Sequence, residues 1–363
     1  MRVPVAIVGG GLAGLHAGRL LNAAGIAFQL VEARDRLGGR ILSIDETGKN
    51  SSDALDLGPA WFWPGMQPAL AELTRELGLS AFAQNSDGDV LFERMSKKAI
   101  HRVQAMPQVP ESMRLAGGMG ALVQALADGL PRERLQLASR VTRLSQKPDG
   151  AELTITDAGG GSNRLLAEQV IVALPPRLLA ATVAFDPVLD AATAMRWENT
   201  ATWMASHAKF VALYDRPFWR EQGLSGTAQS MVGPLVEIHD ATTASGSAAI
   251  FGFVGLGAAQ RIKLGEPALV RACVAQLGRL FGPVKPRATL YKDWAADPLT
   301  ATEADQTGGD HPVPARSPWV NGSWAERLSL GGSETSMTEP SYLAGAIAAA
   351  ACAVSDVRRR LKR

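Results

Sequence analysis

Residues 5–40 read VAIVGGGLAGLHAGRLLNAAGIAFQLVEARDRLGGR, and this stretch predicts the fold of the N-terminal part of the chain. An apolar strand over 3–10 is followed by a helix over 12–25 and by a second apolar strand over 26–33. This order forms one βαβ unit, in which two parallel strands lie in one sheet and helices cover its faces. The sequence therefore predicts an α/β fold built on a parallel sheet.

Three glycines in this stretch have the spacing G-x-G-x-x-G, at Gly9, Gly11 and Gly14. The first permits a tight turn, the second lets the backbone approach a pyrophosphate, and the third packs the helix against the strand. Glu32 ends the next strand, where a carboxylate can accept hydrogen bonds from a ribose diol. A purely structural turn would not require a carboxylate there, so the pattern predicts dinucleotide binding.

The residues after the second strand, ARDRLGGR, extend this motif. Arg34 and Arg40 flank a second glycine pair, Gly38 and Gly39, which can bring backbone and guanidinium groups to the same diphosphate. The combined pattern E-A-R-x-R-x-G-G-R resembles the flavin-containing amine oxidase superfamily, which is typified by the monoamine oxidases. That superfamily also includes protoporphyrinogen oxidase-like and phytoene desaturase-like enzymes.

In that superfamily the extended motif binds FAD, so the resemblance implies FAD as the cofactor. The contacts that it implies in this stretch are Gly9, Gly11, Ala13, Gly14, Glu32, Arg34, Gly39 and Arg40. The two cysteines, Cys273 and Cys352, lie outside the segments expected at the flavin. The FAD is therefore expected to bind noncovalently.

Two further segments resemble the family in the same order along the chain. LDLGPAWFWP, at 55–64, looks like the stretch that passes the flavin, which implies Gly58 and Trp61 as cofactor contacts. SRVTRL, at 139–144, resembles a strand whose backbone meets the adenine, here at Val141. Each segment alone could be an ordinary core strand or aromatic cluster, and only their shared order supports the resemblance.

The segment GGSETSMTEPSYLAGA, at 331–346, resembles the last flavin-binding segment of the family. By this resemblance Glu334 contacts the ribityl chain, and the backbone near Leu343 contacts the pyrimidine end of the isoalloxazine. Tyr342 has the spacing from Glu334 of a monoamine oxidase tyrosine that flanks the flavin face and steers the amine. The alternative for Tyr342 is a core residue with a satisfied hydroxyl.

The partner of that tyrosine in the family's aromatic cage is missing from the sequence. It would fall near Ala304 or Asp305, and neither is aromatic. Trp294 or Trp324 could compensate, so we leave open whether the cage is complete.

Lys209 stands in the apolar strand HAKFVALY, where an ammonium group without a partner would be costly to bury. In amine oxidases a lysine nine residues before the phenylalanine of a P-F-W group binds flavin N5 through water. Lys209 and Phe218 keep this spacing. The resemblance implies that Lys209 aids hydride acceptance and the reaction of the reduced flavin with oxygen. The alternative is an ordinary lysine at a solvated strand edge.

Residues 92–114 form only a short connection before the helix GALVQALADGL. Relatives usually insert several helices at this point, which cover the substrate cavity. We therefore expect a short form of the family, with either a more open site or one that another protomer closes in a homo-oligomer.

The pattern over the remaining chain predicts a discontinuous Rossmann-like FAD-binding domain with an inserted α+β substrate domain on a mixed sheet. The second domain is indicated by strands near 207–214, 229–239 and 248–254 and by a helix near 267–281. The expected bounds are 1–68, 115–198 and 295–363 for the FAD-binding domain, and 69–114 and 199–294 for the substrate domain.

Composition excludes several other classes of protein. A net charge of +2 over 363 residues provides no field that would attract nucleic acid. The few cysteines and histidines form no metal spacing, and no apolar stretch reaches membrane-spanning length without glycines or charges. The N-terminus leads directly into the glycine motif and lacks a signal cleavage site. We therefore expect a soluble cytoplasmic protein without metal, membrane or nucleic-acid partners.

The function that these features indicate is an FAD-dependent amine oxidase that passes hydride from a C–H next to nitrogen to flavin N5, with O2 as acceptor and H2O2 as product. Two alternatives stay open. One is a renalase-like or desaturase-like flavin enzyme that acts on nicotinamides or large apolar molecules. The other is a flavoprotein with a mainly binding role.

Overall fold

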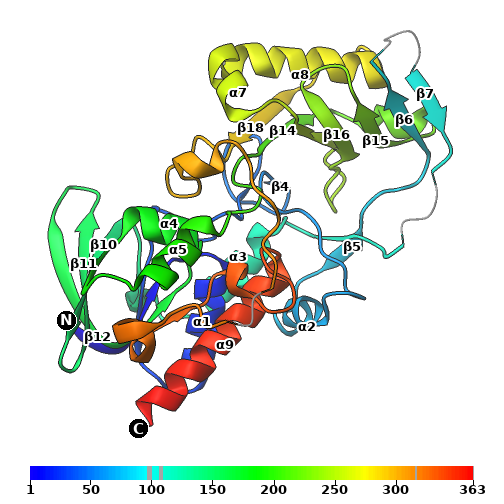
Figure 1. Ribbon diagram of the computed structural model, residues 1–363. Helices are drawn as coiled ribbons and strands as arrows, with labels where there is room; N and C mark the ends of the chain where they lie inside the picture. Colours follow the sequence, from blue (N-terminus) through cyan, green and yellow to red (C-terminus); the bar gives the residue numbers. More distant parts are fainter. Residues whose placement is uncertain (96–99, 106–108, 315–316, 363) are drawn as a thin grey trace. The chain divides into compact units, whose positions relative to one another are not determined.

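A computed structural model describes residues 1–95, 100–105, 109–314 and 317–362 (Figure 1). Packing of the backbone divides the chain into two compact units. The first unit comprises residues 1–40, 123–203 and 298–363, and the second comprises 41–122 and 204–297. Each unit is described by itself below.

The first unit is built on a sheet with the strand order β13-β10-β11-β12-β1-β2-β9, and β19 also pairs with β12. Its strands are β1 (Arg2–Val8), β2 (Phe28–Val31), β9 (Leu135–Gln136), β10 (Ser139–Lys147), β11 (Gly150–Asp157), β12 (Ser162–Val172), β13 (Ala184–Asp186) and β19 (Leu328–Leu330). The pairs β12–β1, β1–β2, β2–β9 and β12–β19 are parallel, whereas β10, β11 and β12 form an antiparallel meander. The predicted parallel sheet with an N-terminal βαβ unit is confirmed.

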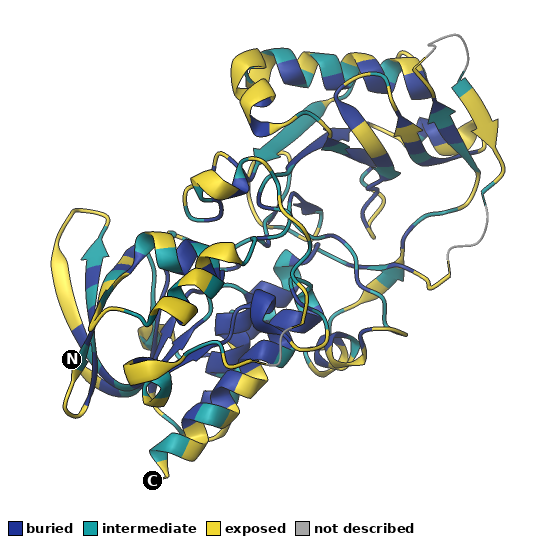
Figure 2. Ribbon diagram, in the orientation of Figure 1, coloured by how far each residue is buried: buried dark blue, intermediate teal, exposed yellow. Residues whose placement is uncertain are grey.

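Helices α1 (Leu12–Ala23) and α9 (Leu343–Leu361) pack against each other, and α9 also contacts β12 and β19. Both helices are buried over much of their length, as Figure 2 shows, and most of their buried residues are small or apolar. Beside them the unit contains α4 (Pro176–Thr182), α5 (Ala191–Asn199), η1 (Arg132–Arg134), η2 (Glu303–Asp305), η3 (Gly322–Glu326) and η4 (Ser333–Thr335), while α3 (Gly120–Asp128) spans the boundary of the units.

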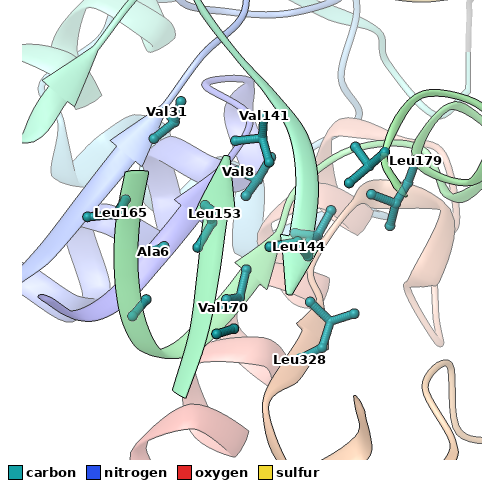
Figure 3. Packing of buried hydrophobic residues seen from close by; sticks show 14 of the residues in the cluster. Ala6, Val8, Val31, Val141, Leu144, Leu153, Leu165, Val170, Leu179 and Leu328 are labelled. Atoms are coloured by element: carbon teal, nitrogen blue, oxygen red, sulfur yellow. The ribbon is translucent and has the colours of Figure 1, made fainter. Parts of the chain in front are cut away.

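One core cluster of the first unit joins the sheet to α4, α5 and η3 (Figure 3). Ala6 and Val8 of β1 point into this cluster. Because side chains alternate along a strand, Val5 and Ile7, which are fully buried, point to the opposite face. Strand β1 is therefore covered on both faces, as a central strand of a parallel sheet should be.

The second unit is built on a sheet with the strand order β18-β14-β17-β16-β15-β6-β7. Its elements are β3 (Ser43–Ile44), β4 (Leu55–Asp56), α2 (Pro68–Glu76), β5 (Ala81–Ala83), β6 (Asp89–Glu93), β7 (Ile100–Val103), β8 (Met113–Leu115), β14 (Ala208–Leu213), α6 (Phe218–Glu221), β15 (Leu224–Ser230), β16 (Leu235–Asp240), β17 (Ala249–Val254), α7 (Ala258–Leu264), α8 (Glu266–Phe281) and β18 (Ala288–Asp293). The predicted mixed sheet is confirmed, since β15–β6 is parallel and its other pairs are antiparallel.

Strand β14 is buried on both faces. Phe210 and Ala212 point into a cluster that includes α8, whereas Val211 and Leu213 point into a second cluster with Leu55 and other side chains of the preceding loops. Lys209 alternates with Phe210 and therefore lies on the same face as Val211.

The single strand expected over 229–239 is wrong, because β15 and β16 are separate strands joined by a turn at 231–234. Gly233 in this turn has a φ of +112°, and a methyl group on it would lie 2.5 Å from Gln276 Oε1. Pro234 follows and provides no backbone N–H for a sheet. A glycine–proline pair inside an apolar run was the signal for this break.

The connection between β6 and α3 is short, as expected. Over its described residues it contains β7 and β8 and no helix. Residues 41–68 group with the second unit by packing, since Leu55 and Leu57 share an apolar cluster with Val211 and Phe251. The predicted domain bounds, which assign 41–68 to the FAD-binding domain, stay a prediction.

Candidate active site

The glycine turn between β1 and α1 has the geometry that its sequence predicts. Gly9 has a φ of +105°, and its N–H donates to the Val31 carbonyl at 2.9 Å. A methyl group on Gly14 would lie 1.9 Å from the Gly9 carbonyl oxygen, so the helix can approach the strand only at a glycine. At Gly11 such a methyl group would lie 3.8 Å from the Gly38 carbonyl oxygen, an ordinary van der Waals contact, so the turn itself would tolerate it. Ala13 lies buried in the first turn of α1.

Glu32 follows β2 and is 6% exposed. Its Oε2 accepts the N–H of Gly10 at 2.5 Å, and its Oε1 accepts the N–H of Arg34 at 2.8 Å. Its own carbonyl accepts the N–H of Ser139 at 2.9 Å, which ties it to the start of β10. Because each carboxylate oxygen has a further lone pair, Glu32 can still accept a hydrogen bond from a hydroxyl group.

A second loop, formed by residues 36–39, lies against the glycine turn. The Gly38 N–H donates to the Gly10 carbonyl at 2.8 Å, and Gly39, with a φ of +58°, closely approaches Gly11. Arg36, which sequence reasoning missed, donates to the Gly39 carbonyl at 2.9 Å and braces this loop. Its place between the two predicted arginines was the available signal.

The two arginines that the motif singled out have different partners. Arg34 Nη2 donates to Thr300 Oγ1 at 2.9 Å. Arg40 Nη1 lies 2.6 Å from Glu334 Oε1, and Arg40 Nη2 donates to Ser333 Oγ at 3.1 Å. The structure therefore brings the end of the N-terminal motif to the predicted C-terminal flavin segment.

Glu334 has a side chain that is 0% exposed. Ser333 Oγ donates to its Oε2 at 3.1 Å. Its Oε1 has Arg40 as an ion-pair partner but, among the described residues, no hydrogen bond of good geometry. This buried carboxylate thus retains an acceptor position for a ligand hydroxyl.

Helix α9 begins at Leu343, and it packs against η4, which contains Glu334. Tyr342 is the N-cap residue, its side chain caps no backbone N–H of the helix, and Leu343 is the first helical residue. A methyl group on Gly345 would lie 1.8 Å from the Glu339 carbonyl, so the preceding turn packs tightly on the helix. The positive end of this helix of 19 residues is therefore held against the turn that links it to η4.

Tyr342 contacts two other rings of the first unit. Its ring centroid lies 5.3 Å from that of Trp203 and 5.2 Å from that of His311, and these two are 4.6 Å apart. The Nδ1 of His311 lies 3.1 Å from the Pro312 carbonyl, and its Nε2 has no partner among the residues described. We name Trp203, His311 and Tyr342 the aromatic trio. Sequence reasoning missed Trp203 and His311, since no spacing relates them to Tyr342.

Trp324, considered above as a partner for Tyr342, is a core residue instead. Its Nε1 donates to the Pro187 carbonyl at 2.8 Å, and its ring contacts Phe185 at 5.4 Å. Asp305 is also structural, because its carboxylate accepts Arg177 Nη1 at 2.6 Å and the Thr202 N–H at 3.2 Å.

Val141 lies in β10, and its side chain is buried in the core cluster of the first unit. The pairing of β10 with β11 shifts register between Val141 and Arg143. A backbone contact of Val141 with adenine stays a prediction.

Lys209 lies in the second unit, where it is 3% exposed. Its Nζ donates to the Gly58 carbonyl at 3.1 Å and lies 4.0 Å from the ring centroid of Phe251. Burial lowers the pKa of Lys209 to about 7, although the negative charge of Asp56 opposes this shift. The lysine is therefore buried with a specific carbonyl partner, and the solvated-edge alternative does not apply.

Trp61 belongs to the same group of side chains. Its Nε1 donates to Gln84 Oε1 at 2.8 Å, and its ring contacts Phe251 at 5.3 Å and His239 at 4.8 Å. Trp294, the other candidate considered above, donates from Nε1 to the Leu57 carbonyl at 2.9 Å. The structure thus brings Gly58, Trp61 and Lys209 together around Phe251 and the loop of residues 55–58.

The residues of the first unit fit the adenine diphosphate and ribityl parts of FAD. Such a ligand needs the tight glycine turn of Gly9 and Gly14, the acceptor capacity of Glu32 and the unfilled acceptor on Glu334. Cys273 is buried in the core of the second unit around α8, and Cys352 is exposed on α9.

Comparison with protein families decides the classification of the chain. The model of the flavin-containing amine oxidoreductases matches residues 82–358, and that of a NAD(P)-binding Rossmann-like domain matches residues 7–77. The chain belongs to the flavin-containing amine oxidoreductase family. The resemblance inferred from the motifs is therefore confirmed, and a flavin is the cofactor of this family.

Known members of the family are similar along most of their length. A polyamine oxidase of Oryza sativa subsp. japonica is 22% identical, with 98% of this chain and 89% of the relative covered. The protein named flavin-containing monoamine oxidase A of Dictyostelium discoideum is 25% identical, with 80% of this chain and 83% of the relative covered.

Solved structures of the family confirm the fold. Cyclohexylamine oxidase from Brevibacterium oxydans matches with a TM-score of 0.82 at 20% identity, over 99% of this chain and 100% of that chain. A putrescine oxidase solved with putrescine matches with a TM-score of 0.80 at 20% identity, over 99% of both chains.

The described residues offer neither a membrane-spanning helix nor a metal-binding cluster. None of the helices there is long and apolar enough to cross a membrane. The same residues contain no cluster of histidine, cysteine and carboxylate side chains that could hold a metal ion.

Proposed function

We propose that this member of the family is an amine oxidase that binds FAD noncovalently and uses O2 as its electron acceptor. When bound, FAD accepts a hydride from the carbon next to an amine nitrogen and passes the two electrons to O2, which gives H2O2. The resulting imine is hydrolysed to an aldehyde and to ammonia or a shorter amine. The reaction requires a neutral amine, because an ammonium nitrogen has no lone pair to stabilise the developing cation.

The observation that carries this proposal is the buried Glu334, which is ion-paired with Arg40 and keeps an unfilled acceptor. An unfilled acceptor on a fully buried carboxylate is costly unless a ligand supplies a donor. We assign this donor to a ribityl hydroxyl of FAD. We assign the ribose diol to Glu32 and the diphosphate to Gly11, Gly39 and Arg34, with Gly9, Ala13, Gly14 and Val141 forming the surrounding backbone.

Noncovalent binding is supported by the position of both cysteines. Cys273 packs in the apolar core around α8, where burial raises the pKa of its thiol. Cys352 lies on the exposed side of α9, nine residues after Leu343.

We assign Lys209 to the position beside flavin N5 that the family resemblance implies. Its support is the burial of the amine, its bond to the Gly58 carbonyl and its place among Phe251, Phe253 and Trp61. A buried amine that gains or loses its proton near neutral pH can order a water molecule and can place a positive charge where electrons collect.

We assign the aromatic trio to the passage of the amine. Its aromatic faces favour an approaching alkyl amine by dispersion and by attraction to the polarised N–H groups. The free Nε2 of His311 can accept an N–H of the substrate. The names of the relatives, which include monoamine, polyamine, putrescine and cyclohexylamine oxidases, support an alkyl amine as the substrate class.

The test starts from the purified protein, whose visible spectrum and bound cofactor are determined after precipitation of the protein. The flavin is then mixed without oxygen with panels of alkyl amines, amino acids and reduced nicotinamides, and bleaching is followed in a stopped-flow instrument. We expect FAD in the supernatant and rapid bleaching by at least one alkyl amine.

The alternatives give different results in the same experiment. Bleaching by NADH, NADPH or a polyene and not by amines would replace the amine oxidase with a nicotinamide or desaturase activity. A flavin that none of these compounds reduces would indicate a binding role. A protein that cannot be reconstituted with FAD would contradict the whole proposal.

A further inference from the structure

The second unit contains a buried carboxylate that the proposed function does not use. Asp56 ends β4 and is 5% exposed. Its Oδ1 accepts the Ser43 hydroxyl at 2.5 Å and the Met119 N–H at 2.8 Å. Its Oδ2 is buried and has no hydrogen-bond partner among the described residues. A carboxyl group with one oxygen free in the interior stays ionised only beside a positive charge and otherwise takes up a proton.

The same short segment holds the amine of Lys209. Gly58, two residues after Asp56, is the carbonyl to which Lys209 Nζ donates at 3.1 Å. The carbonyl of the preceding residue, Leu57, accepts a hydrogen bond from Trp294 Nε1 at 2.9 Å. Asp56 anchors this segment to the loop before α3, where a methyl group on Gly118 would lie 2.7 Å from Asp56 Oδ1. The carbonyl that Lys209 binds therefore belongs to the segment that Asp56 holds in place.

The other charged groups around Lys209 have hydrogen-bond or ion-pair partners of their own. On β8, Arg114 donates from Nη1 and Nη2 to the Thr242 and Ala241 carbonyls. Opposite Lys209 on β18, Lys292 is paired with Asp297 at 2.8 Å. Toward the sheet interior β17 presents Phe251 and Phe253, which carry no charge.

Two further pairs lie beyond β17. On β16, Glu237 is paired with His239 at 2.7 Å, and Asp240 is paired with Arg220 at 2.8 Å. Asp56 is therefore the carboxylate near Lys209 that has no arginine, lysine or histidine ion pair within the described part of this unit.

We propose that Asp56 is a positioning residue for Lys209: its buried carboxylate keeps a proton on the lysine amine, and its anchored segment fixes the Gly58 carbonyl that the amine binds. The consequence for oxygen chemistry rests on the proposed function, because only there does Lys209 lie beside the flavin. The coupling between the two residues does not depend on it.

The pKa shifts of Asp56 and of Lys209 both agree with this arrangement. Burial raises the pKa of Asp56, and the positive charge of Lys209 opposes that shift. Burial lowers the pKa of Lys209, and the negative charge of Asp56 opposes it in turn. Arg114 also acts on both groups, lowering the pKa of each. An opposite charge at short range typically moves a pKa by about 1–3 units, which is enough to decide the charge of Lys209 at neutral pH.

The first test measures the coupling by protein stability. Asp56→Asn retains an oxygen that can accept the Ser43 and Met119 hydrogen bonds but removes the charge. The free energy of unfolding is measured from about pH 5 to pH 9 for wild type, Asp56→Asn, Lys209→Met and the double variant. The difference between each protein and its Lys209→Met counterpart isolates the titration of Lys209.

We expect this titration to move to lower pH by about one unit or more in the Asp56→Asn background. A titration at the same pH in both backgrounds would overturn the proposal. If Asp56→Asn does not fold at about pH 6, Lys209→Met should restore folding by removing the uncompensated ammonium, and failure of that rescue would overturn it as well.

A matched control separates charge from anchoring. Ser43→Ala removes the hydroxyl that binds both Asp56 Oδ1 and the Gly120 N–H, at 2.5 and 2.7 Å, but leaves the carboxylate charged. We expect Ser43→Ala to lower stability equally across the pH range and to leave the lysine titration in place. A shift as large as that of Asp56→Asn would assign the effect to structure alone.

The second test uses the FAD-loaded enzyme. Reduced flavin, prepared with dithionite so that no amine is needed, is mixed with oxygen at a series of pH values. The pH at which reoxidation slows should fall by about one unit in Asp56→Asn. An unshifted stability titration refutes the Asp56 coupling, whereas a shifted stability titration with a pH-independent reoxidation refutes only the assigned place of Lys209 beside the flavin.

Discussion

Arg40 and Glu334 form an ion pair of 2.6 Å that joins the end of the N-terminal glycine motif to the start of the C-terminal segment. Ser333 binds both partners, since it accepts from Arg40 and donates to Glu334. Arg40 orients the carboxylate from one side, but among the described residues Glu334 Oε1 accepts no hydrogen bond of good geometry. Two distant parts of the sequence therefore form one candidate binding surface for the flavin.

Replacing Glu334 tests this surface. Glu334→Gln should reduce the FAD retained through gel filtration, because an amide cannot form an ion pair with Arg40 and offers one acceptor oxygen in place of two. Removal of one partner from a fully buried pair costs about 3–5 kcal/mol, and the 30% exposure of Arg40 should reduce this loss. Asp356→Asn, which breaks an exposed ion pair on α9, is the control and should retain FAD. Equal FAD content in both variants would contradict the assignment.

Two glycines of the turn should respond differently to the same substitution. Gly14→Ala should destabilise the protein severely, because its methyl group would lie 1.9 Å from the Gly9 carbonyl. Gly11→Ala should fold normally, since the nearest atom is 3.8 Å away, but should bind FAD weakly, because its methyl group would keep a pyrophosphate away from the backbone. Thermal unfolding and FAD titration of both proteins, with Gly65→Ala as a control in open space, check this contrast. Normal FAD affinity of Gly11→Ala would argue against a pyrophosphate at this turn.

The buried amine of Lys209 should make stability depend on pH. Its pKa is lowered to about 7 in the folded protein, against an ordinary value of 10.5 in the unfolded chain. Between these values the unfolded state binds more protons, so the free energy of unfolding rises with pH, by at most about 1.4 kcal/mol per unit. Below pH 7 this contribution is constant. Denaturant unfolding of wild type and Lys209→Met should diverge as the pH is raised from about 7 to 9, and parallel curves would contradict a depressed lysine pKa.

Lys209→Met should also affect the flavin directly. We expect it to retain FAD but to slow the reoxidation of reduced flavin by oxygen by about tenfold or more, the equivalent of about 1.4 kcal/mol in the barrier. Stopped-flow mixing of reduced enzyme with oxygen measures this rate. Lys263→Met, on the exposed side of α7, should behave as wild type. An unchanged reoxidation rate in Lys209→Met would make Lys209 a structural residue.

The aromatic trio predicts a contrast between two tryptophans. Trp203→Ala should slow flavin reduction by amines about fivefold to tenfold, since one aromatic contact contributes about 1 kcal/mol, and Tyr342→Ala should do the same. Trp324→Phe should lower stability, because its Nε1 bond to Pro187 is lost, but should leave the rate constant of flavin reduction unchanged. A rate reduced by Trp324→Phe and not by Trp203→Ala would reverse the assignment.

Much of the fold was predictable because its signals are local. Short-range hydrophobic periodicity predicts the βαβ unit. The spacing of the glycines predicts the tight turn and, with it, the position of Glu32 at the end of the next strand. Lys209 was recognisable as unusual because it is the single charged residue among the six residues of β14, all of which are buried. The family resemblance then supplied the order in which the segments should meet.

The remainder depended on contacts between distant residues. His311 and Trp203 meet Tyr342 only after the chain has folded, and no spacing in the sequence links them. Asp56 was hidden within LDLGPAW, where a carboxylate before a glycine also suits an exposed turn. Its burial and its free Oδ2 become evident only when Ser43, Met119 and Lys209 are placed around it.

The pairing of β12 with both β1 and β19 has a consequence for the synthesis of the protein. Strand β1 ends at Val8, β12 is completed at Val172, and β19 and α9 begin only at Leu328 and Leu343. The parts of α1 and β12 that α9 covers therefore stay uncovered during synthesis until α9 has been made, and long-range parallel pairing of this kind forms slowly. A chain that stops before Leu328 would lose Glu334 and the cover of α1 together, so we expect it to aggregate and not to accumulate as a soluble flavin-free protein.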